Sequence, residues 1–202
     1  AALKPSRFRV QRSATIQAPP EYAFALVNDF KQWEQWSPWD KLDPNMKRTF
    51  DGPATGAGAK YGWTGNDQVG EGQMTIEESK PNELVRIKLE FIKPWPATST
   101  TTFAFQSTTE GGVSDNWKME GNNDFVGKAF SMFMDMDGMI GKDFEKGLAD
   151  IKTAAEAKAK KVAEEKAMAE KAAAEAAAAA AATPAPTEGA APEAGTATAP
   201  AP

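Results

Sequence analysis

The spacing of apolar side chains changes once along this chain, and that change restricts the fold more than any other feature. Through Met119, apolar and polar residues alternate in short segments, most clearly at residues 85–91, and this period of two predicts half-buried strands. Beyond Met132 the apolar residues stand three or four positions apart, as on one face of a helix: Phe133, Met136, Ile140, Phe144, Leu148 and Ile151. The chain is therefore expected to form an α+β domain in which one helix covers the apolar face of an antiparallel sheet.

The strands are expected to follow one another as a meander after an initial strand and two short helices. Residues 8–16 alternate as the first strand, although Arg12 stands on its apolar side. Pro19-Pro20-Glu21 favours the start of a short helix, and a second helical stretch should end at Ser37-Pro38, because a residue before proline avoids the helical region. Further segments with strand character lie between turn residues, at 46–50, 59–63, 73–77, 85–91, 103–105 and 113–119.

The chain beyond Lys152 lacks the residues that build a core. Its only large apolar side chains are Val162 and Met168, so residues 153–182, rich in Ala, Lys and Glu, predict a solvent-exposed helical extension. Residues 183–202, rich in Pro, Ala and Thr, are expected to be disordered. The folded domain is assigned to residues 7–152, and residues 1–6 to a linker from an upstream signal or anchor, because the chain starts without Met.

Composition excludes several kinds of function. The 202 residues include no His and no Cys, which removes thiolate and imidazole zinc sites, Ser-His-Asp triads and Cys-His pairs. A net charge of −5 argues against a nucleic-acid partner, which needs a clustered basic surface. Residues 52–60 lack the Gly-Lys-Ser/Thr ending of a phosphate loop, and residues 135–138 lack the acidic spacing of a calcium loop. Neither a cofactor nor a metal site is expected.

Several strings in the chain resemble one bacterial family. They are Phe8-Arg9-Val10-Gln11-Arg12-Ser13, Ile16-Gln17-Ala18-Pro19-Pro20-Glu21, Trp36-Ser37-Pro38-Trp39-Asp40-Lys41-Leu42-Asp43-Pro44, Gly65-Asn66 with Val69-Gly70-Glu71-Gly72, and Met139-Ile140-Gly141-Lys142-Asp143-Phe144-Glu145. With the order of elements, they make residues 7–152 resemble the polyketide cyclase or dehydrase branch of the SRPBCC or START-like superfamily. The resemblance implies a helix-grip fold, in which a curved antiparallel sheet of about seven strands wraps around a long C-terminal helix, with two short helices after strand one. It also implies a cavity between sheet and helix for an apolar or amphipathic molecule.

The same resemblance bears on location. It implies a hydrophobic segment ahead of the strand that begins at Phe8, and the opening Ala1-Ala2-Leu3 fits the end of such a segment. A cell-envelope location, periplasmic or membrane-anchored, is therefore expected, which would bring the domain near a membrane. A cytoplasmic location is the alternative.

The implied fold would direct a set of apolar side chains into the cavity. The ligand-binding candidates are Trp36, Trp39, Trp63, Met74, Phe91, Phe103, Trp117, Met119, Met136 and Ile140. The cluster of Trp33, Trp36 and Trp39 could form a lip over the cavity mouth. Core packing is the alternative for every one of these residues, because aromatic and Met stripes usually pack. Asp40 and Lys41 could orient a polar ligand head, or they could form a surface ion pair.

Two residues are candidates for proton transfer. Glu71 stands between Gly70 and Gly72, which would permit close approach of a substrate, although alternation puts Glu71 on the face opposite Met74. Tyr61 lies on the same side of its strand as Trp63 and could donate a hydrogen bond to a carbonyl in the cavity.

Three functions remain open at this point. The first expectation is binding or transfer of an apolar or amphipathic small molecule, lipid-like or polyketide-like. The alternatives are a cyclase or dehydratase that acts on a carbonyl substrate in the same cavity, and a protein-interaction module without a ligand. Buried polar groups distinguish the first two, because an enzyme needs an Asp, Glu, Lys or Tyr that faces the cavity in a perturbed environment.

Overall fold

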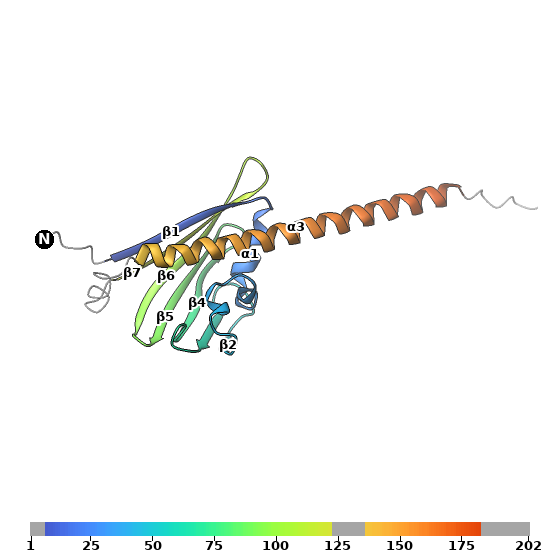
Figure 1. The fold of residues 1–202 in the computed structure, drawn as a ribbon. Helices are drawn as coiled ribbons and strands as arrows, with labels where there is room; N and C mark the ends of the chain where they lie inside the picture. Colours follow the sequence, from blue (N-terminus) through green and yellow to red (C-terminus); the bar gives the residue numbers. More distant parts are fainter. Residues whose placement is uncertain (1–6, 123–135, 183–202) are drawn as a thin grey trace, which may run out of the picture. The chain divides into compact units, whose positions relative to one another are not determined.

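The computed structural model describes residues 7–122 and 136–182, and Figure 1 shows the arrangement of their elements. The strands are β1 (Arg7–Ile16), β2 (Lys47–Asp51), β3 (Lys60–Thr64), β4 (Glu71–Lys80), β5 (Leu84–Lys93), β6 (Ala97–Ser107) and β7 (Val113–Asn122). The helices are α1 (Pro20–Asn28), the 3-10 helices η1 (Phe30–Gln35) and η2 (Trp39–Lys41), and α3 (Met136–Ala182).

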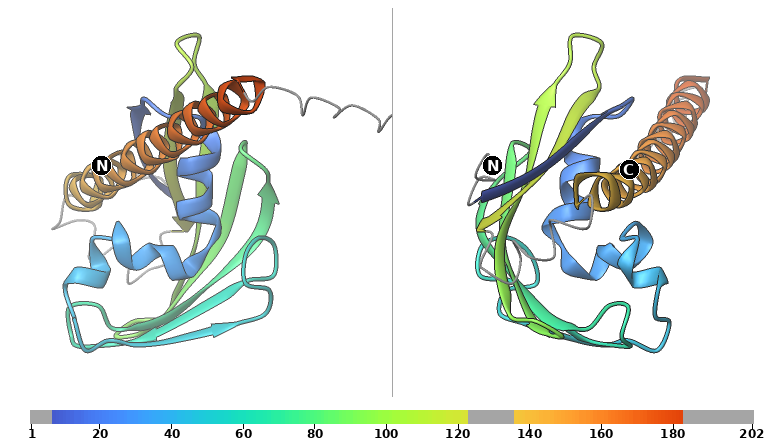
Figure 2. Two further views of the ribbon diagram at one scale, coloured as in Figure 1. Left: turned by 90° about the vertical axis from the view of Figure 1, so that its right-hand side faces the viewer. Right: turned by 60° about the vertical axis from the view of Figure 1, so that its left-hand side comes forward.

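All the strands belong to one antiparallel sheet with the order β1-β7-β6-β5-β4-β3-β2. Strands β2 to β7 form a meander, and β1 pairs with β7 from Arg7 opposite Asn122 to Ile16 opposite Val113. The sheet bends strongly, and α1, η1, η2 and the beginning of α3 lie on its concave side (Figure 2). This arrangement confirms the predicted α+β helix-grip architecture.

Apolar side chains of α3 and the strands form the core on the concave side. Phe144, Leu148 and Ile151 are fully buried, and the Phe144 ring stacks on Trp117 of β7 with the ring centroids 3.9 Å apart. The packed stripe extends beyond Ile151, because Ala155 is buried and Ala159 contacts the core. The sequence does not reveal this continuation, since buried and exposed positions in that part of the helix both hold Ala.

Arg12, on the apolar side of β1, joins that strand to α3. Its Nε lies 2.8 Å from Glu145, and its Nη2 lies 3.1 Å from Asp137. Hydrogen bonds to Asp137 and then Glu145 raise the pKa of the Arg12 guanidinium above its ordinary value. Gly141 leaves the space for this side chain, because a Cβ there would overlap the guanidinium group. The charge on the apolar face is thus compensated by two carboxylates.

The chain divides into two compact units after Val162, within α3. In the second unit, the side chains of residues 163–181 are exposed, and the ion pairs Lys166–Glu170 and Lys171–Glu175 have N–O distances of 3.8 and 3.9 Å. None of the helices in the described ranges is long and apolar enough to cross a membrane. The sequence predictions for residues 1–6 and 183–202 fall outside the described residues.

Candidate functional site

A cavity of about 220 Å³ lies between the sheet and the helices. The strands contribute Tyr61, Trp63, Met74, Leu89, Phe91, Thr101, Trp117 and Met119 to its wall. The helices contribute Trp33, Trp39, Asp40, Ile140 and Phe144, and the connections contribute Ser37, Met46, Gln68 and Val69. Strand residues two positions apart share a face, which is why alternation brings pairs such as Leu89 and Phe91 to the same wall. The wall is mostly aromatic and aliphatic.

The structure brings most of the predicted ligand-binding residues to this cavity, but not all. Those that line it are Trp39, Trp63, Met74, Phe91, Trp117, Met119 and Ile140. Trp36 and Phe103 do not line it, because both have 0% of their surface exposed and pack behind the wall. Phe103 stacks on Trp117 at a centroid distance of 4.7 Å and therefore supports a lining residue from behind. The side chain of Met136 lies outside the described part of the chain.

Two members of the tryptophan cluster, Trp33 and Trp36, are packed inside the domain, and Trp39 is partly buried. Trp33 and Trp36 are 4% and 0% exposed, and their ring centroids lie 4.5 Å apart. Their indole N–H groups donate hydrogen bonds to the carbonyls of Val27 and Leu26, and the length of each bond is 3.0 Å. The last carbonyls of a helix lack partners within the helix, so these two bonds also complete the C-terminal end of α1. Trp33 and Trp39 reach the cavity from this cluster.

One end of the cavity is polar, and Asp40 is at its centre. This residue is buried, and its Oδ1 lies 2.8 Å from Nε of Arg48 and 3.5 Å from the hydroxyl of Tyr61. Burial, followed by the neighbouring Asp40 carboxylate, raises the pKa of Tyr61 above its ordinary value. The phenol therefore stays protonated at physiological pH. Asp40 does not pair with Lys41, whose Nζ lies 2.7 Å from Asp150 instead.

Glu71 does not reach the cavity. Its carboxylate lies 2.7 Å from Nζ of Lys93 at the end of β5, and it is not among the lining residues. The glycine beside it serves a packing role, because a Cβ at Gly72 would overlap the ring of Trp63 and come within 2.6 Å of the Glu90 carbonyl. The room that Gly72 leaves is thus occupied by the protein itself.

Asp115, on β7, is a buried acid that the sequence analysis did not single out. It has 0% of its surface exposed, and neither carboxylate oxygen has a hydrogen-bond partner among the described residues. Burial raises its pKa to about 8. Asp115 stands opposite Ala14 and Phe105 in the neighbouring strands and is not part of the cavity wall.

Sequence reasoning also missed the pairing of Asp40 with Arg48 and the cavity positions of Ser37, Gln68 and Thr101. A signal for Arg48 was present, because it stands between Met46 and Phe50 at the same alternating positions. A charged residue on an apolar face needs an oppositely charged partner, and Arg12 and Arg48 both have one, although only the partner of Arg48 is buried. Neither partner could be identified from the spacing along the chain.

The curved sheet, the helix across it and the apolar cavity between them define a helix-grip protein. Residues 7–156 match the family described as polyketide cyclase / dehydrase and lipid transport, and the chain belongs to that family within the SRPBCC or START-like superfamily. No curated protein matches the chain. Within the described residues, no group of three or more Asp and Glu side chains could hold a metal ion.

Solved structures share this fold at low sequence identity. A Staphylococcus aureus protein of unknown function, SA2116, has a TM-score of 0.56 at 13% identity, over 75% of this chain and 95% of that one. Protein CV1439 from Chromobacterium violaceum has a TM-score of 0.53 at 16% identity, over 76% and 99%. The Aha1 dimer from Colwellia psychrerythraea has a TM-score of 0.50 at 16% identity, over 74% and 96%. These similarities support the fold and do not indicate a function.

Proposed function

We propose that this protein binds and carries an apolar or amphipathic small molecule in the cavity. The observation that supports the proposal most directly is an unfilled space of about 220 Å³ walled by aromatic side chains. An apolar cavity of about 150 Å³ in an engineered protein is large enough for benzene. A molecule with two fused rings is therefore of the right size for this one.

The polar groups of the cavity favour carriage over catalysis. Asp40 and Tyr61 are the only titratable residues in its wall, as far as the described residues show. Asp40 forms an ion pair with Arg48, and the pKa of Tyr61 is raised, so neither residue is suited to remove a proton from a substrate. A cyclase or dehydratase would depend on Tyr61 as a proton donor, and Tyr61→Phe would then abolish turnover.

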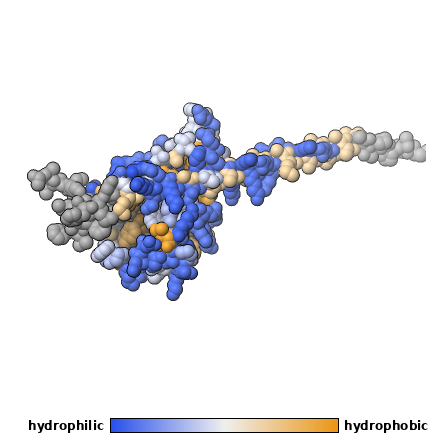
Figure 3. All heavy atoms as spheres, in the orientation of Figure 1, coloured by the Kyte–Doolittle hydropathy of each residue, from blue (hydrophilic) through white to orange (hydrophobic). Residues whose placement is uncertain are grey.

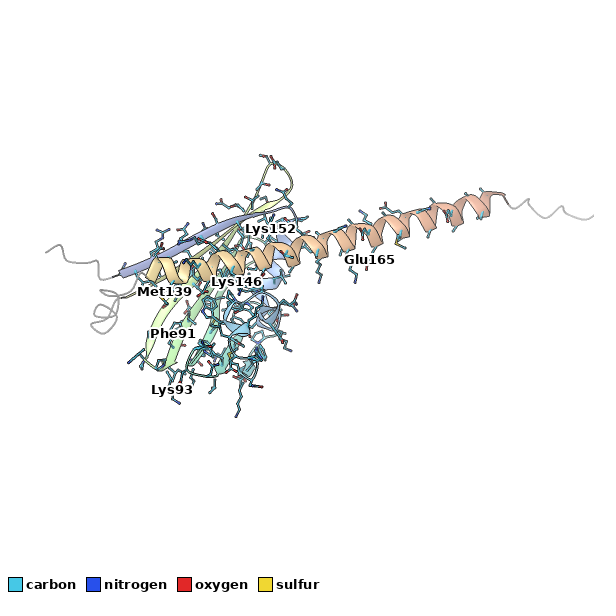
Figure 4. The ribbon with its side chains drawn as sticks, in the orientation of Figure 1. Phe91, Lys93, Met139, Lys146, Lys152 and Glu165 are labelled. Carbon is cyan, nitrogen blue, oxygen red and sulfur yellow. The ribbon has the colours of Figure 1, made fainter. Side chains whose placement is uncertain are left out.

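Access to the cavity is proposed to lie between β5 and the beginning of α3. Phe91 and Ile140 line the cavity and are only partly buried, and the neighbouring Met139 is 55% exposed. Figure 4 places Phe91 and Met139 on the same face of the domain. The space-filling view of that face shows hydrophobic atoms at the surface below α3, among hydrophilic ones (Figure 3).

The proposal is tested by filling the cavity. Leu89→Trp places a larger side chain in the wall, and Ile92→Trp adds the same side chain at an exposed position of the same strand. Titration with the neutral fluorescent probe N-phenyl-1-naphthylamine is expected to show saturable binding by wild type and Ile92→Trp, and at least about tenfold weaker binding by Leu89→Trp. Native mass spectrometry of gently purified protein would show the mass of any ligand that travels with it. The absence of saturable binding by wild type, or equal binding by Leu89→Trp, would contradict the proposal.

A further inference from the structure

The wall of the cavity offers a limited set of polar groups to a ligand. Besides Asp40 and Tyr61, the polar side chains of the wall are Ser37, Gln68 and Thr101. The Thr101 hydroxyl is already engaged, because it accepts a hydrogen bond of 2.8 Å from the Trp117 indole and lies 3.2 Å from the Lys118 carbonyl. A ligand therefore meets two hydroxyl groups, one carboxylate and one amide.

The charges at the Asp40 end of the cavity cancel. Asp40 is the only charged residue in the wall of the cavity, within the described part of the chain, and its Oδ1 is paired with Arg48 at 2.8 Å. The side chains of the pair are 6% and 22% exposed, so both charges are largely removed from water. A ligand group with its own charge would be buried here without a counter-charge, which costs free energy in proportion to its desolvation.

The hydrogen-bonding capacity of the same end is not used up. Oδ2 of Asp40 has no hydrogen-bond partner among the described residues and, unlike the oxygens of Asp115, it is not sealed from solvent. The Tyr61 hydroxyl lies 3.5 Å from Oδ1, which is longer than the usual distance of about 2.7 Å for an O–H donor and an oxygen acceptor. The site can therefore accept one hydrogen bond through Asp40 and donate one through Tyr61.

On the basis of the proposed carrier function, we infer that the cavity selects an uncharged ring compound that bears a hydroxyl group. The ligand hydroxyl donates to Oδ2 of Asp40 and accepts from the hydroxyl of Tyr61. The Asp40–Arg48 pair discriminates against analogues in which a carboxylate or an ammonium replaces the hydroxyl.

Isothermal titration at pH 7 with four ligands on one ring system tests this selection: naphthalene, 2-naphthol, 2-naphthoate and 2-naphthylmethylammonium. Wild type is expected to bind 2-naphthol at least about tenfold more tightly than each of the other three, because a site built to hydrogen-bond a hydroxyl rejects analogues without one. The binding of naphthalene tests the carrier function separately, since this ligand needs only an apolar cavity.

Two variants test whether Asp40 and Tyr61 cause the preference for 2-naphthol. Asp40→Asn removes the partner of Arg48 and is expected to raise the affinity for 2-naphthoate relative to 2-naphthol at least about tenfold. Tyr61→Phe is expected to weaken the binding of 2-naphthol about fivefold without changing the affinity for naphthalene. If Asp40→Asn does not fold, Tyr61→Phe alone tests whether these polar groups cause the selection. Asp43→Asn is the matched control, because Asp43 is equally buried, accepts a hydrogen bond of 2.7 Å from the backbone N–H of Asn66 and does not line the cavity. Its order of ligand preference should equal that of wild type.

The outcomes separate the two proposals. Equal binding of naphthalene, 2-naphthol and the charged analogues would overturn the selection and leave the carrier function in place. A preference of wild type for 2-naphthoate or for the ammonium compound would also overturn the selection. Failure of all four compounds to bind would overturn both.

Discussion

Asp115 is the residue whose surroundings most strongly oppose its charged form. A carboxylate without a hydrogen-bond partner in the core costs several kcal/mol, so a buried acid of this kind takes up a proton. The pKa of about 8 means that Asp115 is protonated in the folded protein at pH 7, whereas the unfolded chain has it ionised. The residue therefore links folding to proton uptake.

Stability should fall as the pH rises from about 4 to about 8, because in this window the folded state holds a proton at Asp115 that the unfolded state has lost. Asp115→Asn removes this dependence. The free energy of unfolding of Asp115→Asn relative to wild type is expected to increase by about 3–4 kcal/mol between pH 5 and pH 8, measured by urea denaturation. The exposed Asp51→Asn serves as the control and should show no such change. A constant difference across the pH range would show that Asp115 has a partner at its carboxylate.

Trp117 has both a packing and a lining role. Its ring lies between Phe103 and Phe144, at centroid distances of 4.7 and 3.9 Å, and its indole donates to Thr101. Trp117→Ala is therefore expected to cost about 3–5 kcal/mol in thermal or urea unfolding, as for other large-to-small core changes. Trp117→Phe keeps the ring stack and should cost less than half as much. A loss below about 1 kcal/mol in Trp117→Ala would show that the ring borders mainly empty space.

Among the contacts between elements, polar ones join α3 to the second half of β1. Arg12 forms ion pairs with Asp137 and Glu145. The Lys152 ammonium donates a hydrogen bond of 3.0 Å to the Thr15 carbonyl. Figure 4 shows Lys152 where α3 passes over the end of β1. Strand β1 is an edge strand, so these contacts also occupy part of an edge that could otherwise pair with another chain.

Gly141 and Arg12 should be energetically coupled. In the Arg12→Ala background, Gly141→Ala is expected to stabilise the protein by about 1 kcal/mol, because alanine favours a helix over glycine by about that amount. In wild type the gain should be smaller, since the new methyl group displaces the guanidinium. A double-mutant cycle in urea measures the difference. Equal effects in the two backgrounds would mean that Arg12 moves aside without cost.

At the scale of the whole molecule, α3 belongs to two compact units, and the boundary between them follows Val162. The last contacts of the helix with the domain include buried Ala155 and the Glu156 carboxylate, which accepts a hydrogen bond of 2.7 Å from the backbone N–H of Gln17. Beyond Val162 the described side chains are exposed.

Two truncations test where the packed part of α3 ends. A chain that ends after Val162 should melt within a degree or two of the full chain, because exposed residues contribute little to stability. A chain that ends after Ile151 loses Ala155, Ala159 and the Glu156 contact, and it should be less stable by about 1–3 kcal/mol. Differential scanning calorimetry measures both. A large loss after Val162 would show that residues 163–182 stabilise the domain.

The class of fold can be predicted from local sequence patterns, because a period of two and a period near 3.6 are consequences of strand and helix geometry. The sequence therefore predicted the strand at 85–91 and the stripe through Ile151, and alternation brought Trp63, Met74 and Phe91 to one face. The polar segment Thr98–Thr102 of β6 escaped this reasoning, since a strand without apolar alternation has no such signal.

Which inward-facing residues line the cavity, and which pack behind them, depends on contacts between elements that are distant in the sequence. Trp36 and Trp39 belong to the same tryptophan-rich segment, and Phe103 and Trp117 both stand at alternating apolar positions of their strands. Within each pair the two residues differ in their distance from the cavity, which spacing along the chain does not encode. The pairing of Asp40 with Arg48 and the isolation of Asp115 have the same origin. Periodicity fixes the face on which a side chain lies, whereas its partners come from other elements and exist only after the sheet has closed around the helix.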